Sequence, residues 1–106
     1  MRVDATLAAF LDSRHRVRGQ REIYIGTIDT ALVSTRDIVR FTLLERARAV
    51  VVYHNHPSGD PTPSDEDIAF SKKLKISLAT VDIELVDHLV IGSHRFQSMK
   101  GQGYLD

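Results

Sequence analysis

Two histidines at the end of an apolar run are the residues of this sequence best placed to do chemistry. His54 and His56 close a stretch in which residues 50–53 are Val-Val-Val-Tyr. In an extended segment, residues two apart point to the same face, so both imidazoles can approach one point while Asn55 points away. Neutral imidazole nitrogens are common zinc ligands, and a catalytic zinc site keeps one coordination position for water. A third protein ligand is therefore expected nearby.

The segment that follows the histidines offers this third ligand. Ser64 follows a proline and Asp67 lies three residues later, an arrangement typical of a helix that begins with a capping box. A carboxylate in the first turn projects back past the helix N-terminus, towards the end of the preceding strand. The linker over residues 57–63 holds three prolines and one glycine, which restrict its path. We therefore predict a metal site formed by His54, His56 and Asp67.

Each part of this site has a simpler interpretation when taken alone. A His-x-His pair on a surface usually binds no metal, and a serine with an aspartate three residues later is usually only a helix cap. Three other carboxylates compete for the ligand role, of which the last two are expected in solvent: Asp60, Asp65 and Glu66. The remaining histidines are expected to be structural (His88) or exposed near turns (His15 and His94). The short linker between the three residues is what favours the metal site.

The elements that must position these residues can be read from the apolar patterns. Strands are expected over residues 5–11, 21–28 and 49–53. After residue 80 we expect one strand, a turn at Gly92 and a second short strand. Residues 12–21 are expected to form the long polar tip of a hairpin. The strand at 49–53 is short, continuous and β-branched, which indicates a central position. With two helices between strands, the order is ββαβαββ, a mixed β-sheet flanked by helices in the α/β class.

The two helices are expected over residues 34–49 and 64–78. The first would begin at Ser34 or Thr35. Its apolar face would be formed by residues at helical spacing: Ile38, Val39, Phe41, Leu43 and Leu44. The second carries acids in its first turn and lysines in its second half, which suits the helix dipole. Its buried positions are expected to be Phe70, Leu74 and Leu78.

Composition limits the classes of protein to which the chain can belong. Its 106 residues are enough for a single domain over residues 1–106. It has no cysteine, which excludes disulfides and zinc sites built on thiolates. No apolar run approaches the roughly 20 residues of a membrane span, and the start does not resemble a signal peptide. A cytoplasmic location is expected.

The charge distribution bears on nucleic-acid binding. Lysine plus arginine equals aspartate plus glutamate at 14 each, so the chain lacks the basic excess of most proteins that bind a phosphate backbone. A local basic group is present near the expected hairpin: Arg14, Arg16, Arg18 and Arg21. This group could bind nucleic acid, but a solvated hairpin explains it more simply.

The stretch from His54 to Asp67 resembles a known metalloprotease signature. The segment "HNHPSGDPTPSDED" contains H-x-H-x7-S-x2-D, the JAMM motif of MPN-type metalloproteases. The sequence "HNHPSGDPTPS" resembles that of the RadC family, whose carboxy-terminal domain carries this motif. The similarity extends from about residue 4 to residue 105 and includes "VDHLVIG" and the ending "RFQSMKGQGYL". RadC proteins usually have an amino-terminal helical region, so the resemblance implies that this chain is a fragment of a longer protein.

The resemblance implies a JAMM-like fold, related in architecture to the cytidine deaminases, and a set of residue roles. By motif position, His54, His56 and Asp67 would bind zinc. Ser64 would form hydrogen bonds near the metal-bound water and to the oxyanion of a tetrahedral intermediate. The reaction implied is hydrolysis of an amide, peptide or isopeptide bond.

The general base of active JAMM enzymes is a glutamate at the start of the first strand. In this sequence that place falls near Asp4, whose side chain is one methylene shorter. Its other interpretation is an ordinary polar residue at the entrance of a strand. Glu45 and Glu22 are weaker substitutes for the same role.

Three other functions compete with a metallohydrolase. An HNH nuclease spreads its three residues over some dozens of positions, whereas here they are consecutive. A nucleobase deaminase needs cysteine ligands, which this chain lacks. The serious alternative is a non-catalytic binding module, since RadC proteins carry a historical label of DNA repair. Against it, a structural zinc normally has four protein ligands, and only three are visible here. The sequence names no substrate and no oligomeric state.

Overall fold

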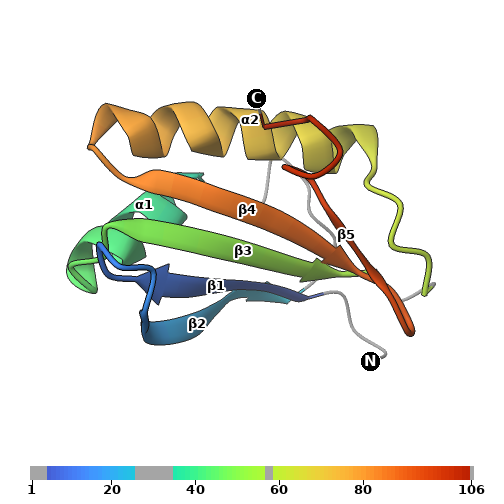
Figure 1. Cartoon of the computed structure of the whole chain (residues 1–106), viewed down its shortest axis with the longest axis horizontal. Helices are drawn as coiled ribbons and strands as arrows, with labels where there is room; N and C mark the ends of the chain where they lie inside the picture. Colours follow the sequence, from blue (N-terminus) through green and yellow to red (C-terminus); the bar gives the residue numbers. More distant parts are fainter. Residues whose placement is uncertain (1–4, 26–34, 57–58, 106) are drawn as a thin grey trace.

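The chain forms a five-stranded sheet with two helices, seen in a computed structural model that describes residues 5–25, 35–56 and 59–105 (Figure 1). The strands are β1 (Ala5–Leu11), β2 (Val17–Ile25), β3 (Ala49–Asn55), β4 (Glu84–Ile91) and β5 (Phe96–Ser98), and the helices are α1 (Thr35–Leu44) and α2 (Asp65–Thr80). The strand order is β2-β1-β3-β4-β5. The mixed α/β class and the order ββαβαββ predicted from the sequence are confirmed.

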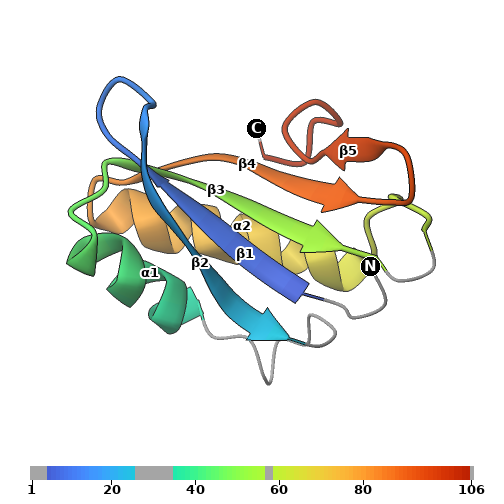
Figure 2. The same ribbon diagram turned by 90° about the horizontal axis from the view of Figure 1, so that it is seen from below.

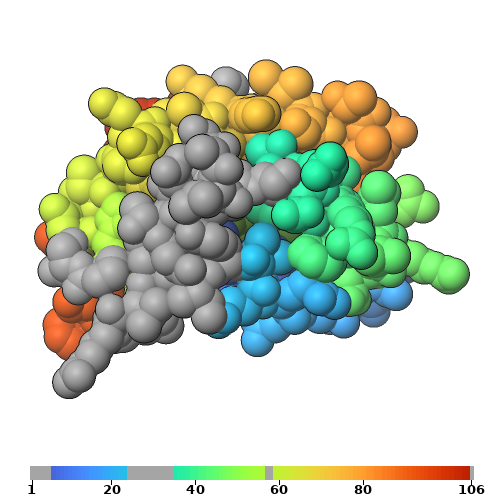
Figure 3. Space-filling model, turned by 180° about the vertical axis from the view of Figure 1, so that it is seen from behind, coloured from blue at the N-terminus to red at the C-terminus, as the bar shows by residue number. Residues whose placement is uncertain are grey.

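Both helices lie on one face of the sheet (Figure 2), and in the view from behind the atoms of α1 lie beside those of the second half of α2 (Figure 3). The core between the two layers takes residues from alternate positions of the strands, because successive side chains of a strand point to opposite faces. From the sheet it takes Ala8, Phe10, Val50, Val52 and Val90. From the helices it takes Ile38, Phe70, Leu74 and Leu78. The three α2 positions predicted to be buried are therefore confirmed.

The central strand β3 connects the two halves of the sheet. It pairs antiparallel with β1 and parallel with β4. A parallel pair needs a crossover, and α2 provides it. A crossover helix begins near the end of the strand that precedes it, so the N-terminus of α2 lies at the edge where β3 ends. This topology is what carries Asp67 back to the two histidines.

The structure corrects two predicted element boundaries. The hairpin tip is shorter than predicted, because β2 begins at Val17 rather than near residue 21. Helix α1 ends at Leu44, five residues before the predicted end at residue 49, and Arg46 then adopts a positive φ of 54°. The buried face of α1 also differs from the predicted one. Ile38 is buried as predicted and Thr42 is buried as well, whereas Leu43 and Leu44 are exposed. The predicted cap Ser34 lies outside the described residues.

Side-chain partners within the chain are found for Arg16, Arg18 and Arg21 of the β1–β2 hairpin. Arg16 Nε lies 2.8 Å from Asp12 Oδ2, and Arg18 Nε donates to the carbonyl oxygen of Glu45 at 3.1 Å. The guanidinium of Arg21 stacks over the ring of Phe41 at 4.4 Å from its centroid. These contacts support the interpretation of the basic group as part of a structural hairpin. Among the described residues, neither helix is long and apolar enough to cross a membrane.

Candidate metal centre

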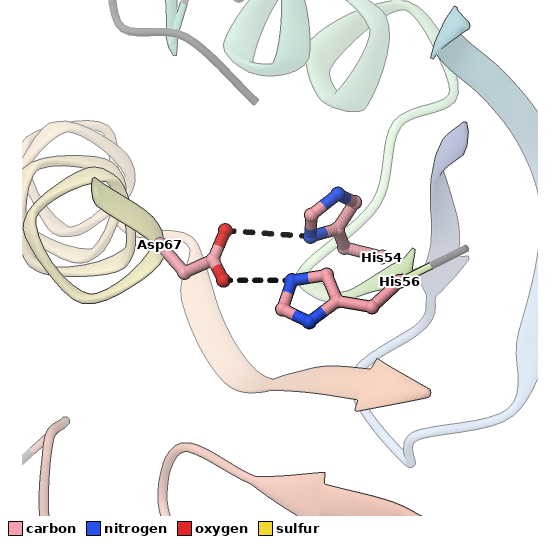
Figure 4. Close-up of side chains that lie close together, drawn as sticks. All are labelled: His54, His56 and Asp67. Atoms are coloured by element: carbon pink, nitrogen blue, oxygen red, sulfur yellow. Dashed lines mark hydrogen bonds and ion pairs between the residues drawn. The ribbon is translucent and has the colours of Figure 1, made fainter. Parts of the chain in front are cut away.

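The three predicted ligands meet where β3 ends and α2 begins. Figure 4 shows both imidazoles pointing at the carboxylate of Asp67. His54 Nδ1 lies 3.3 Å from Asp67 Oδ1, and His56 Nε2 lies 3.1 Å from Asp67 Oδ2. One ligand atom from each of the three residues falls within 4.8 Å of the others. Tetrahedral zinc with bonds of about 2.0 Å separates its ligand atoms by roughly 3.3 Å, so the group is near the size of such a site.

The protonation of His56 supports a cation at this point. Its Nδ1 lies 2.9 Å from the carbonyl oxygen of Asp60, which can only accept, so Nδ1 carries a proton. In the neutral ring, Nε2 then has only a lone pair, and this lone pair faces a carboxylate oxygen at 3.1 Å. Two acceptors at that distance repel each other. A positive charge, either a second proton on the ring or a metal ion, therefore belongs between His56 and Asp67.

Asp67 is buried, with 1% of its surface exposed. Burial alone would raise the pKa of its carboxyl group, but the contact with His54 and the backbone N–H of Ser64 outweigh burial and hold that pKa well below its usual range. The side chain is thus a carboxylate at neutral pH. An ionised, buried carboxylate beside two imidazoles is a suitable donor set for a divalent cation.

Ser64 begins α2 as the predicted capping residue. Its hydroxyl oxygen accepts from the backbone N–H of Asp67 at 3.0 Å, and its own backbone N–H donates to Asp67 Oδ2 at 2.8 Å. The capping box predicted from the sequence is confirmed. It has a second effect, because the bond to Oδ2 turns the carboxylate back towards the end of β3. The same local motif therefore starts the helix and aims the candidate ligand.

Replacing Ser64 with alanine is expected to lower the free energy of unfolding by about 1 kcal/mol, because the N–H of Asp67 loses its capping acceptor. Ser64→Thr keeps the hydroxyl and is expected to remain close to wild type. Urea denaturation of the three proteins measures the difference. Equal stability of the alanine and threonine variants would contradict the capping role.

The turn between β4 and β5 holds the loop that carries His56. The backbone N–H of His56 donates to the carbonyl oxygen of Ile91 at 2.9 Å, and that of Ser93 donates to the carbonyl oxygen of Gly59 at 3.0 Å. Gly59 has a φ of +84°, which favours glycine. Gly92 lies so close that an added Cβ would come within 2.3 Å of the Gly59 carbonyl oxygen. The loop after β3 is thus fastened to a second segment.

Gly92→Ala is expected to push this loop away from the turn. A methyl group at Gly92 would also lie 2.9 Å from Cδ of Pro61, and such overpacking costs about 1–3 kcal/mol. Gly19→Ala is a matched control, since its Cβ would meet only the end of the Glu45 side chain, at 3.4 Å. Thermal unfolding of both variants checks the prediction. A Gly92→Ala protein as stable as Gly19→Ala would show that the loop and the turn are not held together.

Three carboxylates were considered for the role of general base, and the two that the structure describes lie away from the metal centre. Asp4 lies outside the described residues. Glu45 lies beside Gly19, which pairs with Phe10 near the opposite end of β1 from His54. Glu22 is exposed on β2, two strands away from β3. The structure therefore gives no support to Glu45 or Glu22 as the base.

The competing carboxylates and histidines have other positions. Asp60 caps its own turn, because its Oδ1 accepts from the N–H and the hydroxyl of Thr62. Asp65 and Glu66 are exposed, as predicted, and so are His15 and His94. None of these four exposed side chains joins the cluster of His54, His56 and Asp67.

One buried polar pair near the ligands was missed by sequence reasoning. His88 was predicted to be a structural residue, with which its burial agrees, but its contact with Ser71 was not predicted. Both are fully buried, Ser71 Oγ contacts Nδ1 of His88, and the ring of His88 lies 6.4 Å from that of His54. The available signal was a histidine inside an apolar strand pattern, at a position where valine or leucine would be usual.

A pocket of about 280 Å³ lies beside His56 at this end of the sheet. Its walls include the apolar side chains of Leu7, Tyr53 and Ile91 and the amide of Asn55. Tyr53 and Asn55 alternate with His54 along β3, so these walls of the pocket belong to the sheet face opposite to His54.

Comparison with known proteins agrees with this geometry. Residues 2–104 match the family model described as RadC-like JAB domain. The UPF0758 protein XCV4028 of Xanthomonas euvesicatoria is 50% identical over 99 residues, which cover 93% of this chain and 44% of the relative. The UPF0758 protein Smlt0399 of Stenotrophomonas maltophilia is 46% identical over 99 residues, or 93% of this chain and 42% of the relative. The chain thus spans less than half the length of these relatives.

Proposed function

Since this chain belongs to the RadC-like JAB domain family, we propose that it is a zinc-dependent metallohydrolase of the JAMM type. The observation that carries the proposal is the meeting of His54, His56 and Asp67, whose ligand atoms lie within 4.8 Å of one another. The lone pair of His56 Nε2 facing the carboxylate adds to it, because a metal ion between the two groups, like a second proton on the ring, removes their repulsion.

Zinc is the metal that suits these donors best. Two imidazoles and one carboxylate are the ligands of several catalytic zinc sites, which keep a fourth position for water. When bound, zinc would polarise a scissile carbonyl group and lower the pKa of a coordinated water. The proposed reaction is hydrolysis of an amide, peptide or isopeptide bond.

Two further residues have proposed roles in this reaction. The oxygen of the Ser64 hydroxyl accepts from the N–H of Asp67, so its own proton remains available to an oxyanion of the substrate. Asp4 is proposed as the carboxylate that takes a proton from the attacking water and passes it to the leaving amine.

The first test is the metal content of protein purified without added metal, measured by mass spectrometry. About one zinc per chain is expected in the wild type and its loss in His56→Ala. His94→Ala is the matched control, because this exposed histidine lies outside the cluster and its variant should keep the metal. Equal zinc in all three proteins would show that the metal binds elsewhere.

The second test concerns turnover on amide and isopeptide substrates. Asp4→Asn is expected to keep zinc and lose hydrolysis, and undiminished activity would remove Asp4 from the mechanism. If the wild type takes up no zinc even when zinc is offered, the non-catalytic binding module becomes the better proposal. A DNA-binding assay at several salt concentrations would then test its partner.

A further inference from the structure

The loop after β3 binds the second ring nitrogen of His56. Nε2 of this histidine faces Asp67, and Nδ1 points away from it (Figure 4). Nδ1 donates to the backbone carbonyl oxygen of Asp60 at 2.9 Å. Imidazoles that bind a metal almost always donate their second N–H to such an acceptor, which sets the orientation of the ring. The direction of one carbonyl group in the loop therefore affects which nitrogen of His56 is offered to a metal.

The side chain of Asp60 restrains its own carbonyl group. Its Oδ1 accepts from the backbone N–H of Thr62 at 3.0 Å and from the Thr62 hydroxyl at 2.7 Å. The bond to the N–H closes a ring that contains the Cα–C bond of Asp60. Rotation about this bond is what turns the carbonyl group. The contact between Asp60 and Thr62 thus limits the directions in which the carbonyl oxygen can point.

The neighbours of Asp60 hold the same part of the loop. Pro61 confines the residue before it to extended backbone. It is buried beside the turn between β4 and β5, where a Cβ added to Gly92 would lie 2.9 Å from its Cδ. On the other side of Asp60, the carbonyl oxygen of Gly59 accepts from the N–H of Ser93 at 3.0 Å. The carbonyl group of Asp60 therefore lies between two fastened residues.

A carboxylate this close to a metal centre could instead be a ligand, because zinc binds carboxylate oxygens as well as imidazoles. Two observations argue against this for Asp60. Its Oδ1 already accepts from two groups of Thr62. The cluster found among the described residues, with ligand atoms within 4.8 Å of one another, consists of His54, His56 and Asp67 and does not include Asp60. A ligand needs the negative charge, whereas restraint of the turn needs only an oxygen acceptor.

We propose that Asp60 and Thr62 are positioning residues of the metal centre. The side chain of Asp60, held by Thr62, directs the Asp60 carbonyl oxygen at Nδ1 of His56. This hydrogen bond keeps the imidazole turned with Nε2 towards Asp67. Neither residue touches the metal. The inference rests on the proposed function, since it concerns the strength with which the centre binds zinc.

Zinc affinity measured by competition with a chelator tests this role. Asp60→Ala removes the acceptor of both bonds and is expected to bind zinc about 10–100-fold more weakly than the wild type. Asp60→Asn keeps an oxygen acceptor without the charge and should stay close to the wild type. Thr62→Val should fall between the two, because the backbone N–H of residue 62 still donates.

Asp12→Ala is the matched control for Asp60→Ala. Oδ1 of Asp12 also accepts two bonds within its own turn, from the N–H groups of Arg14 at 2.8 Å and Arg16 at 2.9 Å. This turn follows β1 at Leu11, whereas His54 pairs with Thr6 near the other end of the strand. Asp12→Ala should therefore bind zinc like the wild type. Circular dichroism checks that each variant is folded.

The outcomes separate this inference from the proposed function. Wild-type affinity in Asp60→Ala would overturn the inference and leave the proposed function intact. Equal losses in Asp60→Ala and Asp60→Asn would show that the charge of Asp60 is needed, and would refute a positioning role. A loss in Asp12→Ala as large as that in Asp60→Ala would refute it too. A wild type that binds no zinc overturns both proposals.

The ring of His56 gives a second readout that needs no metal. Long-range ¹H–¹⁵N NMR spectra of the metal-free wild type and of Asp60→Asn should show a proton on Nδ1 of His56. In Asp60→Ala this proton should exchange faster with water, because the carbonyl group that holds it is less restrained. An unprotonated Nδ1 in the wild type, or equal exchange in all three proteins, would overturn the inference.

Discussion

Asp67→Asn is expected to abolish tight zinc binding while the chain stays folded. The carboxylate of Asp67 meets both imidazoles, with one oxygen at 3.3 Å from His54 and the other at 3.1 Å from His56. Asparagine offers one neutral oxygen in place of two charged ones. The loss should exceed the roughly 100-fold that removal of a supporting contact costs, because a ligand itself is lost.

The fold should survive this change because the amide oxygen of asparagine can still accept from the backbone N–H of Ser64, as the carboxylate does at 2.8 Å. Asp65→Asn is the matched control: it removes a charge from the same helical turn, but the side chain is exposed. A zinc titration measures the affinity of both variants, and circular dichroism checks that both remain folded. Zinc affinity in Asp67→Asn equal to that in Asp65→Asn would exclude Asp67 as a ligand.

The second large effect expected is a loss of stability in mild acid, caused by His88. Burial lowers the pKa of this side chain from its ordinary value of 6.5 to about 4 in the folded chain. Between these two pH values the unfolded chain binds more protons than the folded one, so the free energy of unfolding rises with pH. It should therefore fall by about 3 kcal/mol as the pH is lowered from 7 to 4, since one pKa unit corresponds to about 1.4 kcal/mol.

Urea denaturation of the metal-free protein at several pH values measures this slope. Four charged or titratable groups act on His88: Asp67 and Asp87 raise its pKa, and His54 and His56 lower it. Because these groups remain in His88→Asn, the difference between the two proteins isolates His88. The variant should have a flatter profile between pH 6.5 and 4. Asp67 acts at lower pH, because a lowered carboxyl pKa removes stability only below 3.8. Parallel profiles above pH 4 would contradict the prediction.

Local patterns in the sequence predicted the elements of this fold well where one signal was strong. The β-branched run at residues 49–53 identified the central strand, and the serine and aspartate before an apolar helical pattern identified the start of α2. Both signals depend only on neighbouring residues, so no distant contact could reverse them. The predicted end of α1 was wrong because no strong local signal marks it. Its sequence continues to favour helix beyond Leu44, but the chain turns at Arg46, where φ is 54°, before it enters β3 at Ala49.

The candidate ligands were predicted because their spacing is local. His54 and His56 are two residues apart on a strand, and Asp67 follows within one short loop and one helical turn. A strand followed by a capped crossover helix brings such residues together whatever the rest of the sheet does. The sequence by itself therefore determined the fold class, the family and the three residues proposed to hold the metal.

Only the tertiary structure decided what surrounds those ligands. Ser71 and His88 are 17 residues apart, and nothing in their spacing indicates a contact. The turn at Gly92 meets the loop at Gly59 across an even longer separation. Such contacts depend on the register between β3 and β4 and on the depth at which α2 packs. Both are set by the summed packing of the whole core, which no short stretch of sequence specifies.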